Sequence, residues 1–116
     1  MGMSREKARR DEIPPGTLYM LILRTLARDG ELHGYEIANS IQRISEDVLQ
    51  VEEGSLYPAL QRMLIKGWVV AEWGTTAENR RARYYRLTAA GRKQLESELS
   101  SYQRVSGAIA RVLATA

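Results

Sequence analysis

The order of segments between residues 54 and 91 constrains the fold of this chain more than any other feature. A helical pattern is followed by a glycine, an aromatic run, a polar loop rich in arginine and a second aromatic run. Aromatic and β-branched residues favour strands, so residues 68–73 and 83–87 are predicted to pair as a hairpin. The intervening residues 74–82 are too many for a two-residue turn and are predicted to form an extended loop.

Positive charge is concentrated in this hairpin. The whole chain of 116 residues has a net charge of only +3. Between Thr75 and Lys93, six cationic residues stand against one acidic residue, so this stretch carries +5 and the rest of the chain −2. A run of charge alone usually marks a solvated face. On a hairpin that follows a helix, it indicates a contact with nucleic acid.

Two helices are predicted upstream. The first runs from a cap at Thr17 to about Ala27, and its apolar residues lie on opposite sides, which indicates burial on both. In so short a chain, we expect the side with Met20 and Leu23 to contact a partner subunit. The second runs from Gly34 to about Ser45, and residues 48–51 are expected to form a short strand or extended turn. The residues of this helix predicted to point inward are Ile37, Ala38, Ile41 and Ile44.

The third and last helices complete the expected fold. The third begins near Gly54, with Pro58 in its first turn, and Gly67 follows it at the left-handed closing position. The last is capped by Thr88 and runs to about Leu113, a rod of about 40 Å at ~1.5 Å per residue. Such a rod is longer than the core beneath it, so we expect part of it to contact a second copy. The residues predicted to form the dimer contact are Met20, Leu23, Leu95, Leu99, Tyr102, Ile109 and Leu113.

Three helices followed by a hairpin form a helix-turn-helix with a wing. The expected fold class is therefore mainly α with a small β-hairpin, a winged helix-turn-helix plus a long C-terminal dimerisation helix. We expect a flexible N-terminal arm over residues 1–13, a winged-helix DNA-binding domain over 14–88 and the dimerisation helix over 89–116.

The candidate DNA contacts lie on the outer side of the third helix and at the hairpin tip. Gln61 and Arg62 have side chains that read base edges, whereas Ser55 and Lys66 suit phosphates. Ala59 and Ile65 are also expected to point away from the core. The candidate contacts are Ser55, Tyr57, Pro58, Gln61, Arg62, Lys66, Asn79, Arg80, Arg81 and Arg83.

Several aromatic residues have a structural interpretation as well as a functional one. His33 is the sole histidine and is expected to start a helix rather than to bind a metal. Trp68 and Trp73 are expected in the core, with the lining of a ligand pocket as the alternative. On the second strand of the hairpin, Tyr85 and Leu87 are predicted to point inward and Tyr84 and Arg86 outward.

The composition argues against an enzyme. There is no cysteine, no glycine loop that cradles phosphate and no zinc-binding HExxH motif, so no catalytic residue, cofactor or metal site is predicted. No apolar stretch is long enough to span a membrane, and the charged N-terminus is not followed by the apolar segment of a signal peptide. We therefore expect a cytoplasmic protein without membrane contact.

Three longer motifs resemble the PadR family of bacterial transcriptional regulators. They are HGYEI at 33–37, EGSLYPAL at 53–60, and the block from Gly67-Trp68 through AEWG and ENRRARYYRLTAAG to Arg92. The resemblance covers roughly residues 14–95 and is to the shorter subgroup, with one helix after the wing. It implies a role for Ser55, Tyr57 and Pro58 in the recognition helix and for Arg80, Arg81 and Arg83 in the wing.

The resemblance implies a dimeric repressor of a palindromic operator, and in some members release of DNA when a small phenolic or drug-like effector binds. The residues themselves predict a homodimer that binds double-stranded DNA at an inverted repeat. One alternative stays open, a winged-helix module that binds another protein through the wing or the third helix.

Overall fold

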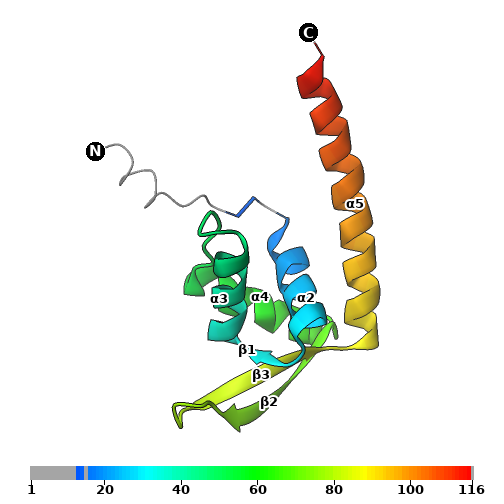
Figure 1. The fold of residues 1–116 in the computed structure, drawn as a ribbon. Coiled ribbons are helices and arrows are strands. Elements are labelled where there is room, and N and C mark those ends of the chain that lie inside the picture. Colours follow the sequence, from blue (N-terminus) through cyan, green and yellow to red (C-terminus); the bar gives the residue numbers. More distant parts are fainter. Residues whose placement is uncertain (1–12, 15, 116) are drawn as a thin grey trace, which may run out of the picture.

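The chain folds into a helical layer above a small sheet, with one long helix rising beside it (Figure 1). The computed structural model describes residues 13–14 and 16–115. The layer contains α2 (Leu18–Asp29), α3 (Gly34–Ile44) and α4 (Glu53–Ile65), and the long helix is α5 (Ala89–Ala114). Strands β1 (Leu32–His33), β2 (Val69–Thr75) and β3 (Arg81–Leu87) form an antiparallel sheet in the order β1-β3-β2. The predicted winged helix with a long C-terminal helix is confirmed, while residues 1–12 of the predicted arm lie outside the described residues.

Local interactions determine where α2 and α3 begin and end. Helix α2 runs two residues beyond the expected end, to Asp29, and stops at Gly30, which adopts a φ of +84°. Thr17 occupies the capping position, but its side chain does not cap α2; its hydroxyl donates to the Pro14 carbonyl at 2.7 Å. His33 caps α3, since its Nδ1 accepts from the Glu36 amide while the Glu36 carboxylate accepts from the His33 amide. The structural role predicted for His33 is confirmed.

The ends of α4 and α5 are joined by hydrogen bonds. Gly67 closes α4 with a φ of +78°, as predicted. The Thr88 hydroxyl accepts from the Gly91 amide at 3.0 Å and donates to the Gly67 carbonyl at 2.7 Å, so the cap of α5 also holds the end of α4. Pro58 lies in the second turn of α4, not the first, because the helix already begins at Glu53. Proline has no backbone N–H, so the carbonyl one turn back loses a hydrogen bond. Pro58 lies on the exposed side of α4, where this loss costs least.

The wing differs in detail from the predicted hairpin. Its strands extend further toward the tip, so the connecting loop shrinks from the expected residues 74–82 to residues 76–80. The two-residue strand β1 was not predicted; it adds to the other edge of β3, with Leu32 opposite Tyr85 and His33 opposite Tyr84. Residues 48–51 contribute no strand to this sheet.

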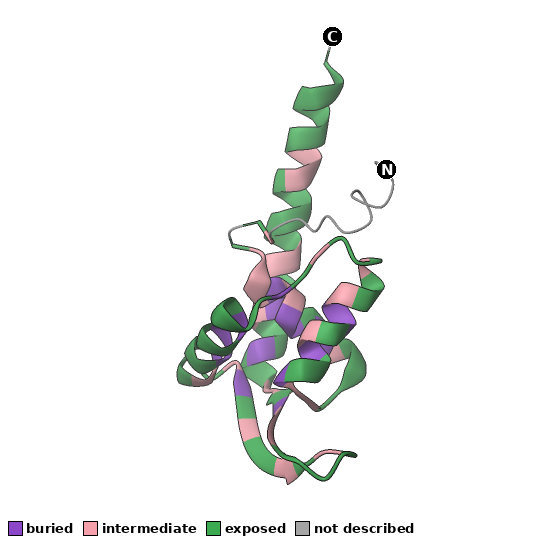
Figure 2. Ribbon diagram, turned by 90° about the vertical axis from the view of Figure 1, so that its left-hand side faces the viewer, coloured by how far each residue is buried: buried purple, intermediate pink, exposed green. Residues whose placement is uncertain are grey.

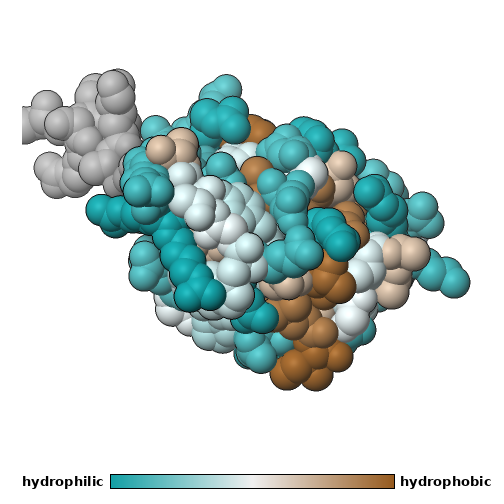
Figure 3. Space-filling view, turned by 90° about the horizontal axis from the view of Figure 1, so that it is seen from below, coloured by the Kyte–Doolittle hydropathy of each residue, from teal (hydrophilic) through white to brown (hydrophobic). Residues whose placement is uncertain are grey.

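Buried residues lie between the helices and where the sheet meets them, whereas the wing and most of α5 are exposed (Figure 2). Seen from below, polar side chains cover most of the visible surface and leave a hydrophobic patch at one edge (Figure 3). No helix within the described part of the chain is both long and apolar enough to cross a membrane.

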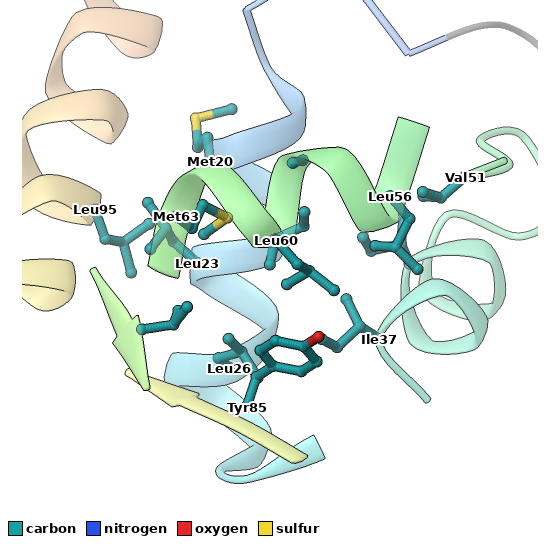
Figure 4. Close-up of a cluster of buried hydrophobic side chains, with 14 residues drawn as sticks. Met20, Leu23, Leu26, Ile37, Val51, Leu56, Leu60, Met63, Tyr85 and Leu95 are labelled. Carbon is teal, nitrogen blue, oxygen red and sulfur yellow. The ribbon is translucent and has the colours of Figure 1, made fainter. Parts of the chain in front are cut away.

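The core joins side chains from every helix and from the sheet (Figure 4). Tyr85 of β3 lies at the base of the core, close to Leu26 and Ile37 in the view of Figure 4, and Leu95 enters from α5. The inward orientation predicted for Tyr85 is therefore confirmed. The largest fully buried side chains are Ile22, Leu23, Leu26, Ile37, Leu56, Leu60, Met63 and Val69.

Several side chains that were predicted to be exposed are buried, or the reverse. Met20, Leu23 and Leu95 are buried inside a single copy, because α5 packs against α2 of its own chain. The packing of a single copy therefore already accounts for their burial. Ala59 of α4 is fully buried although it was expected outside, and Ile44 is 52% exposed although it was expected inside.

Candidate nucleic-acid interface

The outer side of α4 presents a row of exposed side chains. Pro58, Gln61 and Ile65 follow one another at spacings of three and four, so they share the face opposite the buried Leu56, Leu60 and Met63. Ser55 and Lys66 are exposed at one edge of that row. Helix α4 is the second helix of the helix-turn-helix, which in motifs of this kind is the helix that enters a major groove.

Two cations of α4 contact neighbouring aromatic rings. Arg62 donates from Nε to the Tyr19 hydroxyl at 2.6 Å, and its guanidinium lies 5.9 Å from the centre of that ring. The Lys66 ammonium lies 5.2 Å from the centre of the Trp68 ring. Both side chains therefore lie along the edge of α4 nearest α2, and Gln61 is closer to the middle of the outer face.

Tyr57 lies on the opposite edge of α4 and is half-buried against α3. A Cβ placed on Gly34 would lie only 2.7 Å from the Tyr57 ring, so the glycine makes this close approach feasible. Burial raises the pKa of the Tyr57 phenol, and the negative charge of Glu53 raises it further. A tyrosine hydroxyl is neutral at physiological pH even without this shift, so the Tyr57 hydroxyl can donate to a phosphate.

The tip of the wing is a tight turn. The Thr76 amide donates to the Arg80 carbonyl at 2.8 Å, and the Asn79 amide donates to the Thr76 carbonyl at 2.9 Å. Asn79 adopts a left-handed φ of 63°, which asparagine tolerates better than most residues. Arg80 follows directly and is exposed, so these hydrogen bonds hold the backbone of a cationic tip.

The register of the hairpin divides the wing cations between its two faces. Arg83 pairs with Trp73, and Arg81 lies two residues away on the same face of β3. This face is an extension of the one that carries Tyr85 into the core, so it turns toward α3 and α4. Arg86 lies on the other face. Arg81 was expected in the loop but lies in the strand, which orients its side chain.

A groove of about 690 Å³ separates this face of the wing from the starts of α3 and α4. Tyr57 and Tyr35 line one side, and Trp73, Arg81 and Arg83 line the other. Arg80 and a single acidic residue, Glu78, complete its charged lining. The groove therefore combines flat apolar walls with an excess of positive charge, a surface complementary to a nucleic-acid strand.

The structure thus brings together part of the predicted set and adds two residues to it. Tyr57, Arg80, Arg81 and Arg83 line the same groove, whereas Arg62 and Lys66 lie at the far edge of α4. Trp73 was expected in the core but is 60% exposed, because β2 extends beyond the helical layer. Tyr35, which is 71% exposed in the first turn of α3, was not singled out by the sequence patterns. Trp68, in contrast, packs against the core.

The described residues show no arrangement suited to metal binding. No group of three histidine, cysteine, aspartate or glutamate side chains among them lies close enough to hold an ion. His33 contacts Glu36 and the Tyr84 ring, which are interactions of its capping position.

Comparison with known proteins agrees with this geometry. The sequence model of the PadR-like family of transcriptional regulators matches residues 22–97. A transcriptional regulator of Mycobacterium tuberculosis is 32% identical over 80 residues, which cover 69% of this chain and 71% of that protein.

Two solved structures extend the likeness to the fold. A transcriptional regulator from Clostridium thermocellum matches with a TM-score of 0.75 and 26% identity, over 83% of this chain and 92% of that one. A PadR-like transcriptional regulator from Bacillus cereus matches with a TM-score of 0.74 and 28% identity, over 87% of this chain and 95% of that one. With a family match over most of the chain and the same fold, this protein belongs to the PadR-like family of transcriptional regulators, which are not enzymes.

Proposed function

We propose that two copies of this chain bind an inverted repeat in duplex DNA and repress transcription from it. The observation that carries the proposal is the position of the basic wing face beside the exposed side of α4. In this arrangement α4 enters the major groove and reads base edges, while the wing contacts the phosphate backbone. Sequence preference and affinity then come from different elements.

The dimer contact in this proposal lies on the distal half of α5. Apolar side chains there recur at spacings of three and four and are 49–78% exposed in a single copy. They are Tyr102, Val105, Ile109, Val112 and Leu113. A second copy of the same helix would cover them and would fix the distance between the two α4 helices. A small-molecule effector would act by changing that distance or the angle between them.

Binding to duplex DNA as a function of salt tests the proposal. The duplex is the region upstream of the chain's own gene, with a duplex of shuffled sequence as control, and binding is followed by fluorescence anisotropy. If each subunit neutralises about four phosphates, log K should fall with log salt with a slope of about −7. Absent or salt-insensitive binding would contradict DNA binding and favour a winged-helix module that binds protein.

Two substitutions on α4 separate base reading from positioning. Arg62 is engaged with Tyr19 at the edge of α4, whereas Gln61 lies near the middle of the outer face. Gln61→Ala should reduce the preference for the operator over shuffled DNA by about 1–3 kcal/mol, and Arg62→Ala should reduce it less. The reverse order would show that Arg62 leaves Tyr19 to read the bases.

A further inference from the structure

We propose that Trp73 is a positioning residue that holds Arg81 and Arg83 against the sugar–phosphate backbone of one DNA strand lying in the groove between the wing and Tyr57. The inference rests on the proposed function and deepens it. It assigns a role to an exposed aromatic residue that the fold itself does not use, and it fixes the path of one strand across the protein.

Trp73 lies where the sheet extends beyond the helices. Trp73 shares one face of β2 and β3 with Val69 and Tyr85. Close to the helices this face is part of the core, and Val69 and Tyr85 are buried there. At Trp73 the helical layer has ended, so the indole is 60% exposed. A large apolar side chain in this position adds little to the core. Its exposed surface borders the groove.

The indole ring of Trp73 contacts two guanidinium groups. The Arg81 guanidinium lies 4.6 Å from the centre of the indole, and that of Arg83 lies 5.9 Å from it. Arginine stacked on a ring keeps its planar fork of N–H donors available for phosphate. A side chain already held in place also loses less conformational freedom when it binds. Trp73 therefore prepares both arginines for a phosphate backbone.

The opposite wall of the groove is also aromatic. Tyr57 and Tyr35 present two further rings from α4 and α3, and Arg80 adds a cation at the tip. An occupant that matches both walls is anionic along its length and has weakly polar surfaces between its charges. A DNA strand has these properties, with phosphates for the arginines and deoxyribose faces for the rings. An acidic peptide would also match the charge, but it lacks the regularly repeated phosphates and sugar rings of a DNA strand.

The fluorescence of Trp73 tests whether DNA occupies the groove. The chain has two tryptophans, so Trp68→Phe leaves Trp73 as the sole reporter. A short duplex of mixed sequence at low salt suffices, because backbone contacts do not depend on sequence. Saturation with this duplex should protect Trp73 from quenching by acrylamide. Unchanged quenching in a complex that demonstrably forms would overturn the inference.

The salt dependence of binding tests the positioning role. Trp73→Leu should weaken binding about three- to tenfold because two cation–π contacts are lost, and Trp73→Phe should weaken it less. The slope of log K against log salt should stay unchanged in Trp73→Leu, since no charge is removed, whereas Arg81→Ala should make it shallower by about 1. A merely structural role would lower the melting temperature without this pattern. Trp73→Leu that binds as tightly as the parent would overturn the inference.

Arg86→Ala is the matched control. It removes the same charge from the same strand but on the opposite face of the wing. It should leave the protection of Trp73 intact and weaken binding less than Arg81→Ala. Equal effects of the two substitutions would show that only net charge matters and would overturn the inference.

Two further outcomes separate this inference from the proposed function. A deoxynucleoside monophosphate at matched phosphate concentration should protect Trp73 far less than the duplex does. Equal protection would show that the groove is a site for a small anion and would overturn the path assigned to the strand. A parent protein that binds no duplex at low salt would overturn the proposed function, and the inference with it.

Discussion

At the scale of single residues, one glycine of α5 is required by a close backbone contact. A Cβ on Gly91 would lie 2.1 Å from the Trp68 carbonyl oxygen, which also accepts a hydrogen bond from the Thr88 amide. Gly91→Ala should therefore lower the free energy of unfolding by roughly 1–3 kcal/mol, although alanine is the better helix former. Thermal unfolding at fixed protein concentration measures the change.

Gly107 provides the control in the same helix. A Cβ there would have its nearest neighbour, an Arg111 guanidinium nitrogen, at 3.7 Å. Gly107→Ala should raise the free energy of unfolding by up to about 1 kcal/mol through helix propensity alone. If both substitutions change the free energy of unfolding in the same direction, the close approach of Gly91 to Trp68 is not a constraint on the fold.

The ionisation of Asp29 makes the stability of the fold depend on pH in the acidic range. Hydrogen bonds from the Arg28 guanidinium, at 3.0 and 3.1 Å, hold the pKa of the Asp29 carboxyl below its usual range, and the Ser40 hydroxyl adds to this effect. Its folded pKa is therefore below its unfolded pKa. The stabilisation is present above the unfolded value of about 3.9 and is lost as pH falls through the folded value.

Asp29→Asn tests this linkage. The substitution should lower the melting temperature at neutral pH and make its decline below about pH 4 less steep. Glu31→Gln, which removes the same charge two residues away, controls for net charge. A decline in Asp29→Asn as steep as that of the parent would exclude Asp29 as its source.

Among the elements, α5 changes its surroundings along its length. Its first turns pack on α2 and bury Leu95, whereas its distal half exposes apolar side chains, among them Ile109 at 53% and Leu113 at 78%. Ile109→Glu should convert the proposed dimer to monomer in sedimentation, because the carboxylate would be buried against the partner helix. Its melting temperature should lose its dependence on protein concentration.

Gln103→Glu is the control for this substitution. It introduces the same charge into the same helix, at an exposed position away from the apolar seam. It should leave the dimer intact. A dimer that persists in Ile109→Glu would place the contact elsewhere on the molecule.

At the scale of the whole molecule, a dimer with two α4 helices imposes a spacing on its operator. Major-groove half-sites on one face of B-DNA lie about 34 Å apart, or about 10 base pairs. Inserting about half a turn between the half-sites should reduce the affinity to that of a single site, because the second α4 would meet the wrong face of the duplex. The Ile109→Glu monomer should be insensitive to the insertion. A parent protein equally insensitive would contradict binding as a rigid dimer.

Local sequence patterns are sufficient to predict the type and order of the main elements and the segment that carries the positive charge. These features depend on local physics. Hydrophobic periodicity identifies helices, β-branched and aromatic residues identify strands, and caps such as Thr88 with Gly91 act within one turn. For the same reason the start of α3 at His33 and the end of α4 at Gly67 were predictable.

Which surfaces remain exposed depends on how the elements pack together. The two residues of β1 are too few to show periodicity, and they become a strand because β3 offers an open edge. Burial of Leu23 depends on α5, which is distant in sequence, and exposure of Trp73 depends on how far the wing extends beyond the helices. A pattern in sequence identifies apolar residues but not their partners, because the partners come from elements brought together by folding. The basic segment was therefore predictable, whereas the position of its arginines beside an exposed tryptophan, facing α4, came from the packing.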